Sequence, residues 1–145
     1  MKIYFAASIR GGRQDASMYS ALVTYLREFG EVLTEHVGDV GLSPLGDDGP
    51  DDRFIHDRDI AWLISCDLVV AEVSTPSLGV GYEIGLATAL NKPVLSLYRI
   101  VPGLPLSAMI AGSPGVHAIT YSSLDQAKTI IKEFVRKTVP IGRAT

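Results

Sequence analysis

Residues 68–73, Leu-Val-Val-Ala-Glu-Val, form a nearly unbroken apolar run, which leads through a short turn into the glycine-rich segment 76–85, Pro-Ser-Leu-Gly-Val-Gly-Tyr-Glu-Ile-Gly. A strand that is apolar on both faces must be covered on both faces, as central strands of parallel α/β sheets are. Open α/β sheets bind their ligands at the carboxyl ends of such strands. The sequence therefore predicts that Glu83 lies near the start of a helix at a ligand-binding edge.

Short β-prone runs alternate with helical patterns along the whole chain. Strands are predicted at residues 3–7, 32–34, 68–73, 94–98 and 116–120, and helices at residues 14–29, 53–65, 79–91 and 125–137. Alternation of this kind is typical of a parallel sheet. The 145 residues, 47% of them hydrophobic, are enough for one core. We predict a single α/β domain over residues 1–145, Rossmann-like or flavodoxin-like, with a five-stranded parallel sheet and helices on both faces.

Two of these helices carry local predictions. In the helix at residues 53–65, the spacing of Ile60, Leu63 and Ile64 predicts that these side chains share the apolar side. The helix at residues 125–137 follows two serines, and serine is a preferred N-cap residue. We expect Ser122 or Ser123 to cap it.

Two segments lack a regular pattern. Residues 37–52 are rich in Gly, Pro and Asp, which predicts a lid or a disordered loop. Residues 101–114 form a second predicted loop, with the apolar patch Leu-Ser-Ala-Met-Ile at residues 106–110. An apolar patch in a loop indicates burial against another surface. We favour another subunit as that surface.

Composition argues against several classes of protein. The chain has 13 basic and 16 acidic residues, a net charge of −3, and no long like-charged block, so the basic footprint of a nucleic-acid binder is missing. Cys66 is the only cysteine, which excludes an intrachain disulfide and a zinc site of paired thiolates. No stretch approaches the roughly 20 apolar residues of a membrane span, and no signal-peptide pattern is visible. We expect a small-ligand protein of the cytoplasm, and of the nucleus too in a eukaryote, that binds neither nucleic acid nor membrane.

Two predicted loops meet at the carboxyl edge of the sheet. Residues 8–13, Ser-Ile-Arg-Gly-Gly-Arg, follow the first strand, and residues 74–81 follow the third. Hydroxyls, glycine amides, a helix N-terminus and Arg10 together predict a phosphate site. Neither loop is a standard nucleotide fingerprint, because G-x-x-x-x-G-K-S/T is absent and the second loop runs into G-x-G-x-x-x-G. Single glycines could equally serve tight turns, and Arg13 is better explained as a solvated residue at a helix start.

Several side chains could carry chemistry at this edge. The helix dipole favours an ionised Glu83, which suits a nucleophile or a charge stabiliser better than a general acid; dipole complementation is the plainer alternative. His56 and Asp59 share one side of their helix, so they could transfer a proton to a leaving group or could cap the helix. Tyr4 needs a partner if its phenol is buried, although a core tyrosine is the commoner explanation. His36 could bind a ligand or be incidental.

Two other kinds of site find no support. No group of His, Cys and carboxylate residues has metal-ligand spacing. No G-x-S-x-G elbow indicates a serine nucleophile. We expect no metal and no cofactor.

Five segments, in this order along the chain, resemble one known family. They are Tyr4-Phe5-x-x-Ser8-Ile9-Arg10-Gly11-Gly12-Arg13, Leu33-Thr34-Glu35-His36, His56-x-x-Asp59-x-x-Trp62-Leu63, Ser77-Leu78-Gly79-Val80-Gly81-Tyr82-Glu83-x-Gly85 and Leu106-Ser107-Ala108-Met109-Ile110. In these segments the chain resembles the 2'-deoxynucleoside 5'-phosphate N-hydrolases, which are N-glycosidases of the nucleoside 2-deoxyribosyltransferase superfamily. Five ordered motifs are far more specific than any one of them.

The resemblance implies hydrolysis of a 2'-deoxynucleoside 5'-monophosphate to deoxyribose 5-phosphate and a free base. Glu83 matches a nucleophile that forms a glycosyl ester, as in retaining glycosidases. Asp59 matches the carboxylate that assists departure of the base, and Tyr4 the phenol that orients the nucleophile. The implied substrate-binding residues are Phe5, Ser8, Ile9, Arg10, Gly11, His36, Ser77, Gly79, Ser107, Ala108 and Met109. Ser107 matches a serine that reaches the phosphate from a neighbouring subunit, which implies a homodimer.

Other functions are open to the same scaffold. A deoxyribosyltransferase would pass the same intermediate to a second base, but the serines and Arg10 favour a phosphorylated substrate. A pyrimidine ribonucleotide hydrolase differs only in accepting a 2'-hydroxyl. A non-catalytic nucleotide sensor or FMN binder is the alternative from another class. Carboxylates beside a phosphate would weaken a pure phosphate binder, so Glu83 and Asp59 favour an enzyme.

Overall fold

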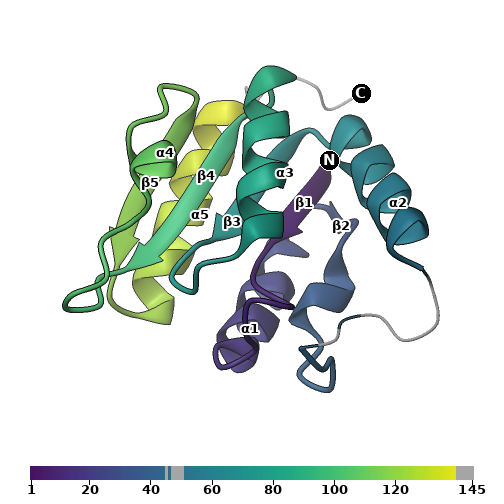
Figure 1. Cartoon of the computed structure of the whole chain (residues 1–145). Helices are drawn as coiled ribbons and strands as arrows, with labels where there is room; N and C mark the ends of the chain where they lie inside the picture. The colour runs from purple at the N-terminus through teal and green to yellow at the C-terminus, as the bar shows by residue number, and fades with distance from the viewer. Residues whose placement is uncertain (45, 47–50, 140–145) are drawn as a thin grey trace.

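The chain folds around one parallel sheet (Figure 1). A computed structural model describes residues 1–44, 46 and 51–139. The strands are β1 Lys2–Ala6, β2 Glu31–Val32, β3 Leu68–Glu72, β4 Val94–Arg99 and β5 Val116–Tyr121, in the order β2-β1-β3-β4-β5. All four neighbouring pairs are parallel. The predicted five-stranded α/β fold is confirmed, and the apolar run 68–73 supplies the central strand.

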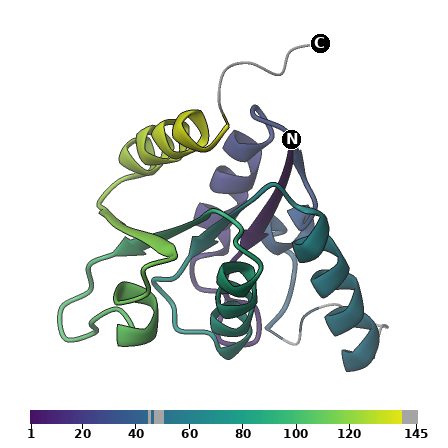
Figure 2. The same cartoon turned by 90° about the horizontal axis from the view of Figure 1, so that it is seen from above.

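Helices cover both faces of the sheet. They are α1 Ala16–Leu26, the 3-10 helix η1 Glu35–Gly38, α2 Asp52–Ser65, α3 Leu78–Ala89, α4 Ala108–Ala111 and α5 Leu124–Thr138. Seen from above, α1 and α5 lie on one face, and α2, α3 and α4 on the other (Figure 2). The sheet therefore separates two apolar clusters, one including Phe5 and Leu22, the other including Tyr4 and Ile84. Successive side chains of each strand alternate between them.

Some local predictions need correction. The one-turn helix α4 lies inside the predicted loop 101–114, and η1 overlaps the start of the predicted loop 37–52; four residues are too few to show a helical period. Ile64 is predicted on the apolar side of α2, but it is 55% exposed, and Leu63 is the one residue of that helix that is buried.

The N-cap predicted for the last helix is Ser123, whose hydroxyl accepts a hydrogen bond from the Gln126 amide. Within the predicted lid or loop 37–52, residues 45 and 47–50 lie outside the described residues.

The strand order places a ligand site between β1 and β3. From β1 the chain turns through α1 to β2 on one side, whereas from β3 it turns through α3 to β4 on the other. Loops that diverge in this way leave a crevice at the carboxyl edge. In the part of the chain that the structure describes, no helix has the length and apolarity to cross a membrane.

Candidate active site

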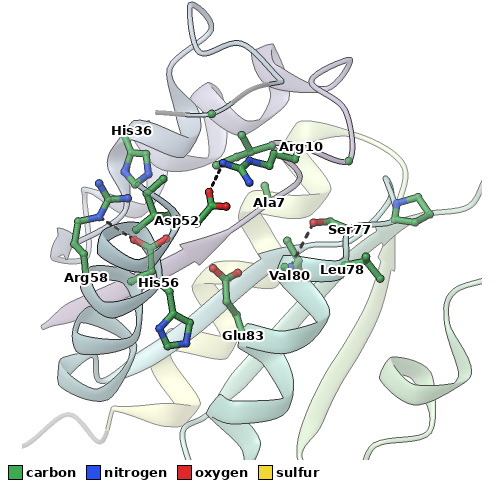
Figure 3. A pocket seen from close by; sticks show the side chains of 17 residues that line it. Ala7, Arg10, His36, Asp52, His56, Arg58, Ser77, Leu78, Val80 and Glu83 are labelled. Carbon is green, nitrogen blue, oxygen red and sulfur yellow. Dashed lines mark hydrogen bonds and ion pairs between the residues drawn. The ribbon is translucent and has the colours of Figure 1, made fainter. Parts of the chain in front are cut away.

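A pocket of about 550 Å³ lies at this crevice (Figure 3). It lies between α2 and α3 and reaches the loop that follows β1. Of the residues predicted at the site, it is lined by Ile9, Arg10, Gly11, His36, Asp59, Ser77, Gly79 and Glu83. Residues of the loop after β1, such as Ile9, and residues at the start of α3, such as Ser77, therefore line one cavity. The sequence predicted that these two loops meet.

Glu83 and Tyr4 form a hydrogen-bonded pair beneath the pocket. Glu83 lies on the second turn of α3, and its side chain points into the pocket (Figure 3). The Tyr4 hydroxyl, from the middle of β1, donates to Glu83 Oε1 over 2.6 Å. Tyr4 is 1% exposed, so its ring packs in the core while its hydroxyl orients the carboxylate. Glu83 Oε2 has no hydrogen-bond partner among the described residues, so it can approach a ligand in the pocket.

The environment raises the pKa of Glu83 to about 7. Burial is the largest cause, and the negative charge of Asp59 adds to it, while the hydrogen bond from Tyr4 acts in the opposite direction. This corrects the expectation that the helix dipole keeps Glu83 ionised: the dipole acts mainly within the first turn, and Glu83 lies beyond it. Burial and the nearby carboxylate also raise the pKa of Tyr4, which therefore remains a hydrogen-bond donor.

Asp59 lies on α2, across the pocket from α3. It accepts a hydrogen bond from Arg58 Nε at 2.9 Å, and this ion pair is mostly shielded from solvent. The Arg58 guanidinium also lies 4.7 Å from the centre of the Trp62 ring, which in turn contacts His36. Arg58 and His36 line one end of the pocket, where their planar groups can stack on a planar ligand, while Trp62 packs against both without lining the pocket itself.

The other end of the pocket can hold an anion. Ser77 caps α3, and its hydroxyl accepts a hydrogen bond from the Val80 amide. The amide groups at the start of this helix carry a partial positive charge, which favours an anion there. Arg10 lines the same end and donates to Asp52 at 2.8 Å in an exposed ion pair. Gly11 permits the closeness of the two loops, because a Cβ there would lie 2.6 Å from the Pro76 carbonyl oxygen. The hydroxyl of Ser8 is buried and lacks a partner among the described residues.

The structure does not bring every predicted residue into this pocket. The side chain of Phe5 points to the opposite face of the sheet and is fully buried there with α1. Ser107 and Met109 line a neighbouring pocket of about 480 Å³, which shares Ser77 with the first, while Ala108 is exposed beside them. Within one chain, therefore, the predicted residues that do not line the cavity that holds Glu83 are Phe5, Ser8, Ser107, Ala108 and Met109, and Tyr4 lies beneath it without lining it.

Arg13 departs from its predicted role as a solvated residue. It donates hydrogen bonds to the carbonyl oxygens of Val37 at 2.9 Å and Asp39 at 2.7 Å, and its guanidinium lies 5.5 Å from the centre of the Tyr19 ring. Partial burial lowers its pKa. Arg13 therefore fastens the segment after β2 to the loop after β1.

Sequence reasoning did not propose Asp52, Ile55 and Arg58 as site residues, yet all three line the pocket. They stand one helical turn apart along α2, at spacings of three residues, so the helical period of α2 together with the placement of Asp59 could have found them. His56 also lines the pocket, but its Nδ1 is hydrogen-bonded to Asp57 Oδ1, and its Nε2 lies 3.3 Å from the Tyr82 hydroxyl. The suggested pairing of His56 with Asp59 is not among the contacts of the described residues.

The sequence profile of the nucleoside 2-deoxyribosyltransferase family matches residues 3–108 of the chain. The chain belongs to this family. The 5-hydroxymethyl-dUMP N-hydrolase of Mus musculus is 47% identical over 147 residues, covering 99% of this chain and 84% of the mouse protein. A putative 2'-deoxynucleoside 5'-phosphate N-hydrolase 1 of Nematostella vectensis is 58% identical over 114 residues, covering 77% of each chain. The family predicted from the five motifs is confirmed.

A solved structure supports the fold assignment. The CMP N-glycosidase of Clostridium botulinum superimposes with a TM-score of 0.66 over 92% of this chain and 99% of its own. At 21% identity this likeness concerns the fold alone.

Proposed function

We propose that this protein hydrolyses the N-glycosidic bond of 2'-deoxynucleoside 5'-monophosphates, with 5-hydroxymethyl-dUMP as the first substrate to test. The observation that carries the proposal is the Tyr4–Glu83 pair at the floor of a pocket whose far end is built for an anion. The names of the relatives, which are N-hydrolases of this class, bear out the reaction predicted from the sequence. The substrate named for the mouse and zebrafish (Danio rerio) relatives, 5-hydroxymethyl-dUMP, guides the choice of base.

The geometry supports a two-step displacement. Glu83 Oε2 attacks the anomeric carbon as the bond from that carbon to the base nitrogen breaks, and the bonding electrons leave with the base. Asp59, on the opposite wall, assists departure by relaying a proton from solvent to the base nitrogen. Water then attacks the same carbon and passes a proton to Asp59, which returns it to solvent. The bond from that carbon to Glu83 Oε2 breaks, deoxyribose 5-phosphate leaves, and the Glu83 carboxylate is regenerated. The Tyr4 hydroxyl stays hydrogen-bonded to Glu83 Oε1 throughout, which keeps Oε2 oriented towards the anomeric carbon.

A phosphorylated substrate accounts for the opposite end of the pocket. Arg10, Ser77 and the amide groups at the start of α3 offer charge-assisted hydrogen bonds to a dianion. A transferase that acts on plain nucleosides would have no group to satisfy them. Because nucleotide anions do not cross membranes readily, we place the protein with its substrate in the cytoplasm and, in a eukaryote, also in the nucleus.

A homodimer would explain one face of the molecule. Leu78 is 97% exposed and Met109 is 83% exposed. On α3 a Cβ built at Gly81 or Gly85 meets no atom within 4 Å, so packing within the described chain does not account for these glycines. Close approach of a second chain would account for the two glycines, since glycine lets two backbones come close together. Such a partner would bring its own Ser107 towards the phosphate end of this pocket.

The proposal is tested by measuring free base released from four separate substrates. They are 5-hydroxymethyl-dUMP, its dephosphorylated nucleoside, the matching ribonucleotide and dGMP. We expect release from the first to exceed release from its nucleoside by at least about 100-fold, because two or more charge-assisted phosphate contacts are lost. Equal release from the nucleoside would contradict the proposal. Base exchange with an added acceptor, in place of hydrolysis, would make the protein a transferase.

A further inference from the structure

A second buried carboxyl lies on the sheet face opposite the pocket. Glu72, the last residue of β3, is 0% exposed. Its Oε1 accepts hydrogen bonds from the hydroxyl and the amide of Ser74, and from the Tyr121 hydroxyl at 3.2 Å. Its Oε2 has no hydrogen-bond partner among the described residues. Burial is the main reason why the pKa of Glu72 is raised.

Ser74 joins this carboxyl to the next strand. While its hydroxyl donates to Glu72, the same oxygen accepts from the backbone amide of Arg99 at 2.8 Å. The Arg99 guanidinium then donates to Asp15 at 2.7 Å in a largely buried ion pair. A hydrogen bond from Thr75 to Asp15, at 3.4 Å, closes the connection back to the loop that contains Ser74.

These contacts tie together the two loops that form the phosphate end of the pocket. Asp15 ends the loop after β1, which carries Ser8 and Arg10, whereas Ser74 begins the loop after β3, which carries Ser77. Both loops are thereby fixed to the end of β4 through Arg99. The side chains of this network do not line the pocket themselves.

Stability alone is a poor explanation for the network. A buried carboxyl with one unsatisfied oxygen costs free energy, and an apolar side chain of similar volume would avoid that cost. Binding sites, in contrast, need their donors held to within about 0.5 Å of the productive geometry. The hydrogen bonds that fix Ser74, three positions before Ser77 in the same loop, meet that need.

We propose that Glu72, Ser74, Arg99 and Asp15 form a buried clamp that fixes the spacing of the two phosphate-binding loops, and that these four are positioning residues for the substrate phosphate. The inference rests on the proposed function, since it names how that same site is kept in shape. Glu83 is anchored separately by Tyr4 and by packing of α3. Loosening the clamp should therefore affect binding more than chemistry.

The first test replaces Ser74 by alanine, which removes the joint and little volume. The matched control is Ser96→Ala, because Ser96 is also a buried serine, in β4, and its hydroxyl has no partner among the described residues. With 5-hydroxymethyl-dUMP we expect Ser74→Ala to raise KM about tenfold and to change kcat by less than about threefold, as loss of one or two buried hydrogen bonds predicts. Ser96→Ala should leave both constants unchanged. An unchanged KM in Ser74→Ala would overturn the inference while leaving the function intact.

A second pair of variants separates positioning from folding. Glu72→Gln keeps an acceptor for Ser74 and should restore a KM close to that of the wild type, whereas Glu72→Ala should raise KM as Ser74→Ala does. Similar KM values for the two Glu72 variants would contradict the clamp.

If the wild type turns over no nucleotide, the proposed function fails, and hydrogen exchange at the backbone amides of Thr75, Ser77 and Leu78 decides about the clamp. Faster exchange in Ser74→Ala than in Ser96→Ala would support the clamp. Equal exchange in the two variants would overturn it.

Discussion

At the scale of single residues, Glu83 combines its proposed role as the nucleophile with an unfavourable environment for its charge. Its pKa is raised to about 7, so roughly half of the molecules carry the carboxylate at neutral pH. A buried carboxylate is also a better nucleophile than a solvated one, because less water must be removed before it attacks. The same burial has consequences for rate and for stability, which can be measured separately.

The first prediction concerns pH. Attack requires ionised Glu83, so kcat/KM should fall as the pH drops below about 7, approaching a tenfold loss per unit. Both kcat and kcat/KM should be measured from pH 5 to 9, so that titration of the substrate phosphate can be recognised. A kcat that stays constant down to pH 5 would show that the titrating carboxylate is not the nucleophile.

The second prediction concerns stability. The folded-state pKa of Glu83 lies above the ordinary value of about 4.5 for a glutamate, so the folded chain holds the proton to higher pH than the unfolded chain does. Its contribution to the free energy of unfolding therefore falls as the pH rises from 4.5 to 7. Glu83→Gln should abolish turnover and yet raise that free energy by up to about 3 kcal/mol at pH 8, and by under about 1 kcal/mol at pH 5.

Urea unfolding at the two pH values checks this stability prediction. Glu133→Gln, a change at an exposed glutamate of α5, is the matched control and should have little effect. Destabilisation by Glu83→Gln at pH 8 would contradict the assigned environment.

At the scale of elements, the start of α3 has two tasks. The Ser77 hydroxyl caps the helix, and the same residue faces the anion end of the pocket. Ser123 caps α5 in the same way but lies away from the pocket. The two serines thus form a natural pair for separating a structural role from a binding role.

We predict that Ser77→Ala and Ser123→Ala each lower the free energy of unfolding by about 1 kcal/mol, the usual loss for an N-cap. Only Ser77→Ala should also raise KM, by about tenfold, because a phosphate contact is lost. Thermal unfolding and steady-state kinetics measure the two effects. An equal KM for both variants would remove Ser77 from the phosphate site.

The elements themselves followed from the sequence where their signals were strong. The strand at residues 68–72 is apolar except for its last residue, and the strand at residues 94–99 starts with β-prone residues, Val-Leu-Ser-Leu-Tyr. The helix α5 has a clear helical period and a serine cap. The four-residue α4 escaped prediction because one turn shows no period. The edge strand β2 is only two residues long, and its position shifted by one residue or more from the prediction.

The site could be predicted only in part, since side chains far apart in the sequence build it. Tyr4 and Glu83 are separated by 79 positions, and nothing local in either motif shows that they touch; the family resemblance supplied that pairing. Arg10 and Asp52, 42 positions apart, had no such guide, and their ion pair was not foreseen. The pKa of Glu83 also escaped prediction, because burial depends on packing that a sequence pattern does not give.

At the scale of the whole molecule, the proposed homodimer makes each active site depend on two chains. Ser107 lines the pocket next to the one that holds Glu83 and is exposed in the single chain. Leu78 and Met109, both highly exposed, line the same pocket as Ser107, so the three residues mark one face of the molecule. If a partner covers this face, Ser107 of each chain serves the site of the other.

Mixed dimers test this arrangement. Glu83→Gln and Ser107→Ala should each reduce activity as homodimers, the first completely and the second by about tenfold or more. In a dimer of one chain of each kind, one site has both an intact Glu83 and an intact Ser107. We predict that mixing the two variants restores activity towards half of the wild-type value per mixed dimer. No gain on mixing would assign Ser107 to its own chain or to no site.

The most direct test of the account is the release of free base from 5-hydroxymethyl-dUMP by the wild type and by Glu83→Gln. Nucleotide binding to both proteins should be measured alongside by calorimetry. We predict rapid release by the wild type, a loss of at least about 10³-fold in Glu83→Gln, and similar nucleotide affinity for both. Base release by Glu83→Gln at the wild-type rate would contradict the assignment of Glu83 as nucleophile.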